Sequence, residues 1–258
     1  MTPIQQMLLG AGSAKKKVYS DEVFSTDTFW GYPNSSGNSL TVNNGIDFAG
    51  EGGLTWFKYR DMTGSHALFD TVRGVTKGLE SHSTSAEYTV SHTALSSYNS
   101  NGYTISEDAN GYIQSSGQTT AAWSFRKAPG FFDIVTWTRS GTNGSARTLD
   151  HSLGCVPGFI MLKQLDSSSE SWICWHTKFD EDNQYLKLNH DHASGTDANA
   201  SVNSVSSTQF VVGADNNKVG SYIAYLFAGG QSPAATAVSV DFNADSDAVY
   251  CGSNSDKS

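Results

Sequence analysis

Two pairs of side chains in this sequence have the residue types and the spacing to bind a transition metal. His190 and His192 are separated by one residue, and so are Cys174 and His176. Residues two apart in an extended segment point to the same side, so each pair could offer two ligands to one zinc ion. The histidine pair, however, occurs once and lies in the loop-like stretch NHDHASGTDAN. Solvated loop histidines are the preferred interpretation, and no metal site is expected.

A second candidate ion site lies near the C-terminus, in the segment DFNADSD. Its side-chain oxygens alternate along the chain, as calcium loops require. Ser246 stands where such a loop needs a glycine for its sharp turn, and Gly252 stands where it needs a bidentate glutamate. A polar hairpin is therefore the preferred interpretation. The four candidate ligands are Asp241, Asn243, Asp245 and Asp247.

The sequence holds none of the familiar catalytic constellations. It has no Gly-x-Ser-x-Gly nucleophile elbow and no glycine-rich phosphate loop ending in Lys-Ser/Thr. It also lacks the Glu-x-Asp-x-x-Glu strand with which sandwich glucanases place carboxylates on one face. Glu51, Glu107 and Glu170 stand alone, and 180–182 reads as a turn. We expect no enzyme activity, no catalytic residue and no cofactor.

Six tryptophans could instead build platforms for sugar rings, as aromatic side chains do in lectin sandwiches. Most of them fall at strand positions that recur along the chain, where core packing is the default interpretation. A sugar site remains the alternative. The residues are Trp30, Trp56, Trp123, Trp137, Trp172 and Trp175.

Composition narrows the class of protein further. The 258 residues carry a formal net charge of −9, which disfavours a nucleic-acid partner. The three cysteines, Cys155, Cys174 and Cys251, are odd in number and have no paired spacing, so folding in a reducing cytoplasm is expected. No apolar run is long enough to cross a membrane, and 7–9 is too short for a signal-peptide core.

From residue 18 onward the pattern is that of short β-strands. Each expected strand is about 4–8 residues long and is bounded by Gly, Asn, Asp or Ser, which is typical of a sandwich or barrel. Abundant glycine, 25 residues, and only 16% charged residues agree with many tight turns. The expected strands are 23–30, 39–42, 54–59, 103–105, 121–125, 132–138, 146–149, 158–163, 172–176, 185–188, 210–212 and 222–227.

The strand pattern occurs twice. Thr41 matches Thr148 at an offset of 107 residues, and Gly53 matches Gly158 at an offset of 105. Further matches pair Trp30 with Trp137, Lys58 with Lys163, GYTI with QFVV and AAWSF with IAYLF, at offsets of 102 to 107. Such drift is expected when strands are retained and turns vary. The sequence predicts an all-β protein of two tandem, related β-sandwich-like units.

Four segments follow from this division: an N-terminal anchor at 1–20, β unit 1 at 21–125, β unit 2 at 126–230, and 231–258 as a linker and the start of a further β domain. The last segment is too short to close a core, so the chain is expected to be the N-terminal part of a longer protein. The anchor is either a short amphipathic helix with a basic linker or a frayed terminus.

Several motifs together resemble a β-rich domain of tailed-phage virion proteins, common in marine phages and often found near the start of fibre-like proteins. They cover roughly 19–229 and include DEVFSTDTFWG, NNGIDFAGEGGLTWFKYRD, HALFDTVRG, AAWSFRKAPGFFDIVTWT and LDHSLGCVPGFIMLK. The opening MTPIQQMLLGAG is also similar to N-termini of such proteins. The stretch VSVDFNADSDAVYCGSNSD resembles the first strands of a concanavalin A-like sandwich.

The resemblance implies a virion protein, assembled in the host cytoplasm, that serves as a tail fibre or fibre-like appendage. It implies docking to tail or capsid proteins through the N-terminus, a homotrimer, and contact with a glycan or protein of the host surface. A free-standing carbohydrate-binding module is the alternative. The expected docking residues are the apolar Ile4, Met7, Leu8 and Leu9, with Lys15, Lys16 and Lys17 over an acidic rim.

Overall fold

The computed structural model describes residues 18–31, 38–90, 94–106, 108, 111–142 and 144–229, together with the backbone of 249–250. Most of the expected anchor and of the expected C-terminal domain therefore lies outside the described residues. From those two segments, β1 (Val18–Tyr19) and β20 (Val249–Tyr250) form a parallel pair of two-residue strands. No helix in the described part is long and apolar enough to cross a membrane.

The chain is all-β and consists of two similar halves, here called unit 1 (β2 to β10) and unit 2 (β11 to β19). Unit 1 has a six-stranded antiparallel sheet with the order β2-β10-β4-β5-β6-β7 and a three-stranded sheet with the order β3-β9-β8. The larger sheet contains β2 (Phe24–Trp30), β10 (Thr119–Arg126), β4 (Gly53–Tyr59), β5 (His66–Asp70), β6 (Lys77–Glu80) and β7 (Tyr88–Thr89); the smaller contains β3 (Leu40–Asn43), β9 (Gly102–Ile105) and β8 (Leu95–Asn99).

Unit 2 repeats this topology strand by strand, with the orders β11-β19-β13-β14-β15-β16 and β12-β18-β17. Short helical turns α2 (Ser20–Val23), α3 (Phe48–Glu51) and the 3-10 turn η1 (Ala214–Asn217) are the helical elements of the described part. The strands of unit 2 are β11 (Phe132–Arg139), β19 (Gly220–Ala228), β13 (Pro157–Gln164), β14 (Ile173–His176), β15 (Gln184–Lys187), β16 (Gly195–Thr196), β12 (Arg147–Asp150), β18 (Gln209–Val212) and β17 (Val202–Val205).

Each unit buries a core between its two sheets. The period-2 alternation of the strands sends every second side chain inward, such as Phe57 and Tyr103 in unit 1 and Leu162 and Phe210 in unit 2. These four side chains are fully or almost fully buried. The expected sandwich-like units are therefore present.

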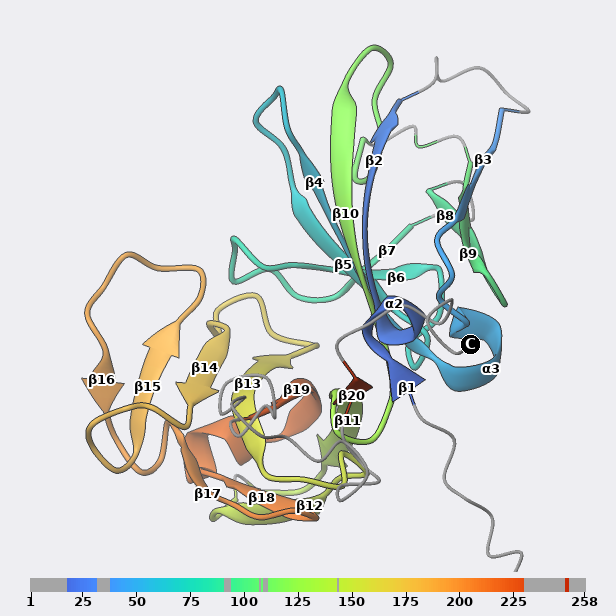
Figure 1. The fold of residues 1–258 in the computed structure, drawn as a ribbon. Helices are drawn as coiled ribbons and strands as arrows, with labels where there is room; N and C mark the ends of the chain where they lie inside the picture. The colour runs from blue at the N-terminus through green and yellow to red at the C-terminus, as the bar shows by residue number, and fades with distance from the viewer. Residues whose placement is uncertain are drawn as a thin grey trace, which may run out of the picture.

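A third core joins the two units through their larger sheets. It combines Leu54 and Leu68 of unit 1 with Met161, Trp172 and Tyr225 of unit 2. Strands β5 and β13 are consequently buried on both faces over most of their length. In Figure 1 the small sheet β3-β9-β8 lies at the right and β12-β18-β17 at the bottom, with the two larger sheets between them.

The strand register confirms one sequence match and corrects another. Gly53 and Gly158 are equivalent, because the carbonyl of each accepts a hydrogen bond from the threonine that follows the next strand. Trp30, by contrast, is not the counterpart of Trp137. Trp137 pairs with Tyr222, and the corresponding residue of β10 pairs with Phe29. Because a one-residue shift moves a side chain to the other face, Trp30 is 60% exposed whereas Trp137 is 5% exposed.

Candidate functional site

The most developed polar site in the described residues lies where the two units meet. Asp70 ends β5, and one of its carboxylate oxygens accepts hydrogen bonds from the backbone N–H groups of Val72 and Arg73 at 3.0 and 2.9 Å. This local turn is typical of an aspartate that replaces a backbone partner. The turn brings the Arg73 guanidinium back onto the other carboxylate oxygen, with Nε donating at 2.6 Å.

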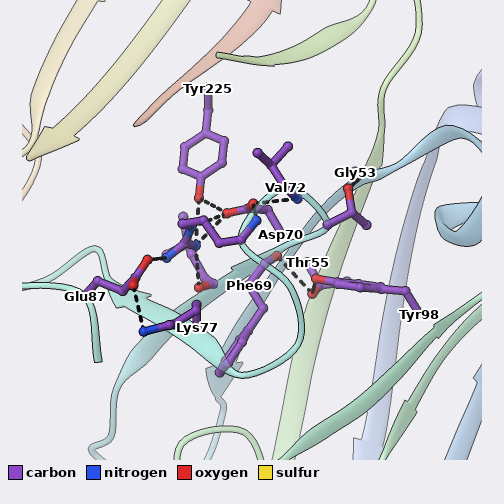
Figure 2. A network of polar contacts seen from close by, with 12 residues as sticks. Gly53, Thr55, Phe69, Asp70, Val72, Lys77, Glu87, Tyr98 and Tyr225 are labelled. Atoms are coloured by element: carbon purple, nitrogen blue, oxygen red, sulfur yellow. Dashed lines mark hydrogen bonds and ion pairs between the residues drawn. The ribbon is translucent and has the colours of Figure 1, made fainter. Parts of the chain in front are cut away.

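Unit 2 completes this network with a single side chain. The Tyr225 hydroxyl donates to Asp70 Oδ2 at 2.8 Å and accepts from Arg73 Nη2 at 3.1 Å. Arg73 Nη1 reaches Glu87 at 3.4 Å, and Glu87 also pairs with Lys77 at 3.2 Å. Figure 2 shows Tyr225 reaching Asp70 from above, with Glu87 and Lys77 at the lower left. We call Asp70, Arg73, Lys77, Glu87 and Tyr225 the junction network.

The centre of the junction network is buried, and the two carboxylates of the network are matched by two cationic side chains. The side chain of Asp70 is 0% exposed and that of Arg73 is 5% exposed. Burial alone disfavours the charged guanidinium, but Tyr225 and Asp70 outweigh it and raise the pKa of Arg73 above its ordinary value. Burial likewise raises the pKa of Tyr225, whose hydroxyl therefore stays protonated and serves as a donor. The network can therefore hold the two units together.

Two further hydrogen bonds cross the same boundary. Trp172 Nε1 donates to the carbonyl of Glu80 at 2.8 Å, and the Glu87 N–H donates to the carbonyl of Leu165 at 2.7 Å. These directional contacts fix the orientation of one unit on the other, which apolar packing alone specifies weakly.

The network belongs to the junction and not to the repeated unit. In unit 1, the residue after Gly53 is Leu54, and it pairs with Asp70. In unit 2, the residue after Gly158 is Phe159, and it pairs with His176, so His176 occupies the position of Asp70. Three residues further on, Phe179 stands in place of Arg73. Unit 2 therefore has a turn at the equivalent place, with different backbone hydrogen bonds and without the charged pair.

One lysine is buried on the junction side of β13. The side chain of Lys163 donates to the carbonyls of Gln164 and Ser167 at 2.8 and 3.1 Å. Burial lowers its pKa to about 8, although the charges of Glu170 and Asp166 act in the opposite direction. The amine is enclosed and occupied by carbonyls, so the geometry gives it no substrate to attack.

A hollow of about 230 Å³ opens at the rim of unit 2, lined in part by Glu170, Tyr185, Asp215, Lys218 and Tyr222. Lys218 pairs with Glu170 at 3.2 Å and with Asp215 at 3.6 Å. Both carboxylates are thus engaged by one ammonium group. The hollow can accept a small polar molecule.

The side chains considered as metal ligands in the sequence do not form a metal site in the described part of the chain. The rings of His190 and His192 stack with centroids 5.1 Å apart in a loop, and His190 Nε2 lies 3.1 Å from Ser171 Oγ. Cys174 lies in the core between the units, where burial raises the pKa of its thiol to about 12 and disfavours the thiolate that metals require. Among the described residues no three metal-ligating side chains form a cluster.

Of the remaining candidate residues from the sequence, some lie within the described residues and others lie outside them. The docking residues Ile4, Met7, Leu8, Leu9, Lys15, Lys16 and Lys17 and the possible calcium ligands of 241–247 lie outside the described residues. Of the tryptophans, Trp137 and Trp172 pack in cores, as expected, and Trp30 is largely exposed. Trp56 and Trp123 lie half-buried on the outer face of unit 1.

Sequence reasoning missed the junction network. Asp70 and Arg73 are visible as part of the turn DTVRG, but their partner Tyr225 lies about 150 residues away and reads as an ordinary strand aromatic. The near-continuous apolar run at 159–162 was a usable signal that this strand is covered on both faces, because strands buried on both faces lose the alternation of apolar and polar residues.

A family model described as a domain of unknown function, DUF7483, matches residues 20–255. The chain is a member of the DUF7483 family. The matched range of this DUF7483 chain includes both units and the junction between them. No curated protein and no solved structure matches the chain.

Proposed function

We propose that this DUF7483 chain is a structural protein of a phage particle, a tail fibre or fibre-like appendage that docks by its N-terminus and contributes to host attachment. The observation that carries the proposal is the junction: two copies of one sandwich unit share a core and a buried, charge-balanced network. A rigid two-unit block of this kind suits a fibre segment that must hold its distal end at a fixed orientation relative to its anchor.

Further support comes from the resemblance of several motifs to virion proteins and from the engaged state of the polar groups described above. The proposed partners are tail or capsid proteins at the N-terminus and sister chains in a trimer. Burying three or four of Ile4, Met7, Leu8 and Leu9 would contribute roughly 1.5–3 kcal/mol each, enough to order a short tail. The basic run at 15–17 would add association rate and orientation.

The experiment uses a phage that encodes this chain and mass spectrometry of purified particles. Three versions are compared: wild type, a chain with the four apolar docking residues changed to serine, and a chain with Lys15, Lys16 and Lys17 changed to glutamine. We expect wild type in particles, near-complete loss of the serine version, and slower incorporation of the glutamine version. Circular dichroism must show the same β-structure in all three.

Two results would overturn parts of the proposal. Absence of the wild-type chain from particles would remove the virion role. Normal incorporation of the serine version would retain the virion role but move the docking surface from the N-terminus to the sandwich faces.

A further inference from the structure

The outer face of the larger sheet in unit 1 is only partly covered by unit 2. Leu54 and Leu68 of this face are buried in the junction, whereas Thr26 and Trp30 are exposed. In unit 2 the centre of the equivalent face is covered, because Ile134, Met161 and Tyr225 are all buried there, although Thr136 and Thr138 further along β11 are exposed. The residues that occupy their positions in unit 1, by strand register, are Thr26, Trp56 and Trp123. Unit 1 thus carries a sheet face that extends beyond the junction.

This extension has an aromatic part. Trp56 and Trp123 are direct cross-strand neighbours, with ring centroids 6.4 Å apart and an edge-to-face angle of 70°. Both are half-buried, and Trp56 also packs against the core shared with unit 2, so it lies at the border of the junction. Trp30 ends β2 and pairs with Thr119 at the edge of the same sheet. Thr26 and Thr28 lie on the same face of β2, and Thr26 pairs directly with Trp123. Aromatic faces beside hydroxyl groups suit ligands that have both apolar C–H faces and polar edges.

The extension also has a cationic part. Trp56 and Lys58 lie two residues apart on one side of β4, about 7 Å apart along the strand. Arg60 follows directly after the end of β4, where its backbone N–H still donates to the carbonyl of Thr119 at 2.9 Å. Lys58 pairs across the sheet with His66, and the rings of His66 and His82 lie 5.3 Å apart. Lys58, Arg60 and His66 line an open hollow of about 590 Å³ together with the turn 61–64.

These bases are not neutralised within the described part of the chain. No described carboxylate forms an ion pair with Lys58, Arg60 or His66. Lys58 Nζ donates instead to the carbonyl of Tyr59 at 2.8 Å, and Asp61 accepts from the backbone N–H of Thr119. Burial and the neighbouring charges of Lys58 and His82 lower the pKa of His66. A lowered pKa favours the neutral form of His66, so the charges that line the hollow are those of Lys58 and Arg60 against the one carboxylate of Asp61. This local positive excess, in a protein of net charge −9, indicates a surface that favours an anion.

We infer that this face, formed by Trp30, Trp56, Lys58, Arg60, His66 and Trp123, binds an acidic polysaccharide. Sugar rings would lie against the tryptophans, and carboxylate or sulfate groups would meet Lys58 and Arg60. The hollow is open, and an open hollow beside a flat sheet face suits an extended chain. The inference goes beyond the proposed structural role and does not depend on it.

The test is calorimetric titration of the full chain with alginate oligosaccharides, a polyuronate, in about 0.15 M salt, where exposed charges farther apart than about 8 Å are largely screened. Dextran of matched length supplies neutral rings, and polyglutamate supplies carboxylates without rings. The variants are Trp30→Ala and the double change Lys58→Gln, Arg60→Gln. The matched control is Lys178→Gln, an exposed lysine in the β14–β15 turn of unit 2.

We expect wild type and K178Q to bind alginate equally, and dextran and polyglutamate to bind much more weakly. W30A should weaken alginate binding several-fold and the double variant by about tenfold or more, since each lost charged contact is worth at least that factor. Absence of alginate binding, or equal binding by all variants, would overturn the inference. Equal binding of polyglutamate would leave only a non-specific charge effect and would overturn the saccharide assignment. A wild-type oligomer that W30A dissociates would overturn it in favour of a second copy of this chain.

Discussion

The hydroxyl of Tyr225 donates to Oδ2 of Asp70 at 2.8 Å, and through this bond a strand of unit 2 reaches the end of a strand of unit 1. Both side chains are fully buried. Since Asp70 Oδ2 also accepts from Arg73, the tyrosine is the one contribution of unit 2 to a charge pair made within unit 1. If one of these three side chains is removed, the buried polar groups of the other two lose a hydrogen-bond partner, and no water can reach them to take its place.

Tyr225→Phe should therefore destabilise the protein by about 1–3 kcal/mol, although it removes a single oxygen atom. Urea unfolding followed by circular dichroism measures the free energy of unfolding. Tyr185→Phe, at the half-buried rim of unit 2, is the control and should change stability by less than about 0.5 kcal/mol. Equal effects of the two changes would show that the hydrogen bond at the junction contributes nothing.

Asp70 and Arg73 should be strongly coupled. Arg73→Met leaves a buried carboxylate without its cation and should cost about 3–5 kcal/mol. Asp70→Asn, Arg73→Met should cost less than the sum of the single changes, because the second change removes the uncompensated charge. A double-mutant cycle measures this coupling, expected within about 0.5–3 kcal/mol. Additive single effects would contradict the charge pairing.

The equivalent glycines should be equally intolerant of a side chain. A Cβ at Gly53 would lie 2.2 Å from the carbonyl oxygen of Phe125, and a Cβ at Gly158 would lie 2.2 Å from Cα of Gly229. Because backbone atoms cannot move aside cheaply, Gly53→Ala and Gly158→Ala should each cost about 1–3 kcal/mol or more in unfolding experiments. The exposed Ser168→Ala is the control, expected within about 0.5 kcal/mol of wild type.

Lys163 should make stability depend on alkaline pH. Its pKa falls from 10.5 when the chain is unfolded to about 8 in the fold, so between these values the unfolded chain binds more protons. Stability contributed by this group therefore rises as pH increases from about 8 to 10.5 and is lowest below pH 8. Between those two pKa values the free energy of unfolding should rise by at most about 1.4 kcal/mol for each pH unit.

Lys163→Met should remove this dependence. The difference in unfolding free energy between variant and wild type should be largest below pH 8 and shrink as pH approaches 10.5. Subtracting the two curves cancels the titration of tyrosines and cysteines in the same range. A difference independent of pH would mean that Lys163 keeps its ordinary pKa in the fold.

The two units should unfold together. Their shared core contains large side chains from both larger sheets, so neither unit can lose its structure without exposing the other's apolar face. Calorimetry should show one transition with equal calorimetric and van't Hoff enthalpies. Two separated transitions would indicate that the junction is weaker than the cores within each unit.

Much of the fold was predictable because strand signals are local. The alternation in 24–30 and the turn residues that bound it need no distant partner to be recognised, and matched strands such as 102–105 and 209–212 revealed the duplication. The misplaced match of Trp30 shows the limit. Two neighbouring aromatics, Phe29 and Trp30, fit the pattern equally well, and only pairing with β10 decided which one faces the core.

The sequence by itself determined that the chain is all-β, that it is built from two related halves, and where most of its strands lie. The tertiary structure decided that the halves meet through their larger sheets and that Asp70, Arg73 and Tyr225 share one network. It also decided that one sheet face extends beyond the junction with its bases unneutralised in the described part. A period-2 pattern states that a strand has two faces but not what covers each face. That choice depends on side chains more than a hundred residues apart, whose contacts exist only once both sheets have formed.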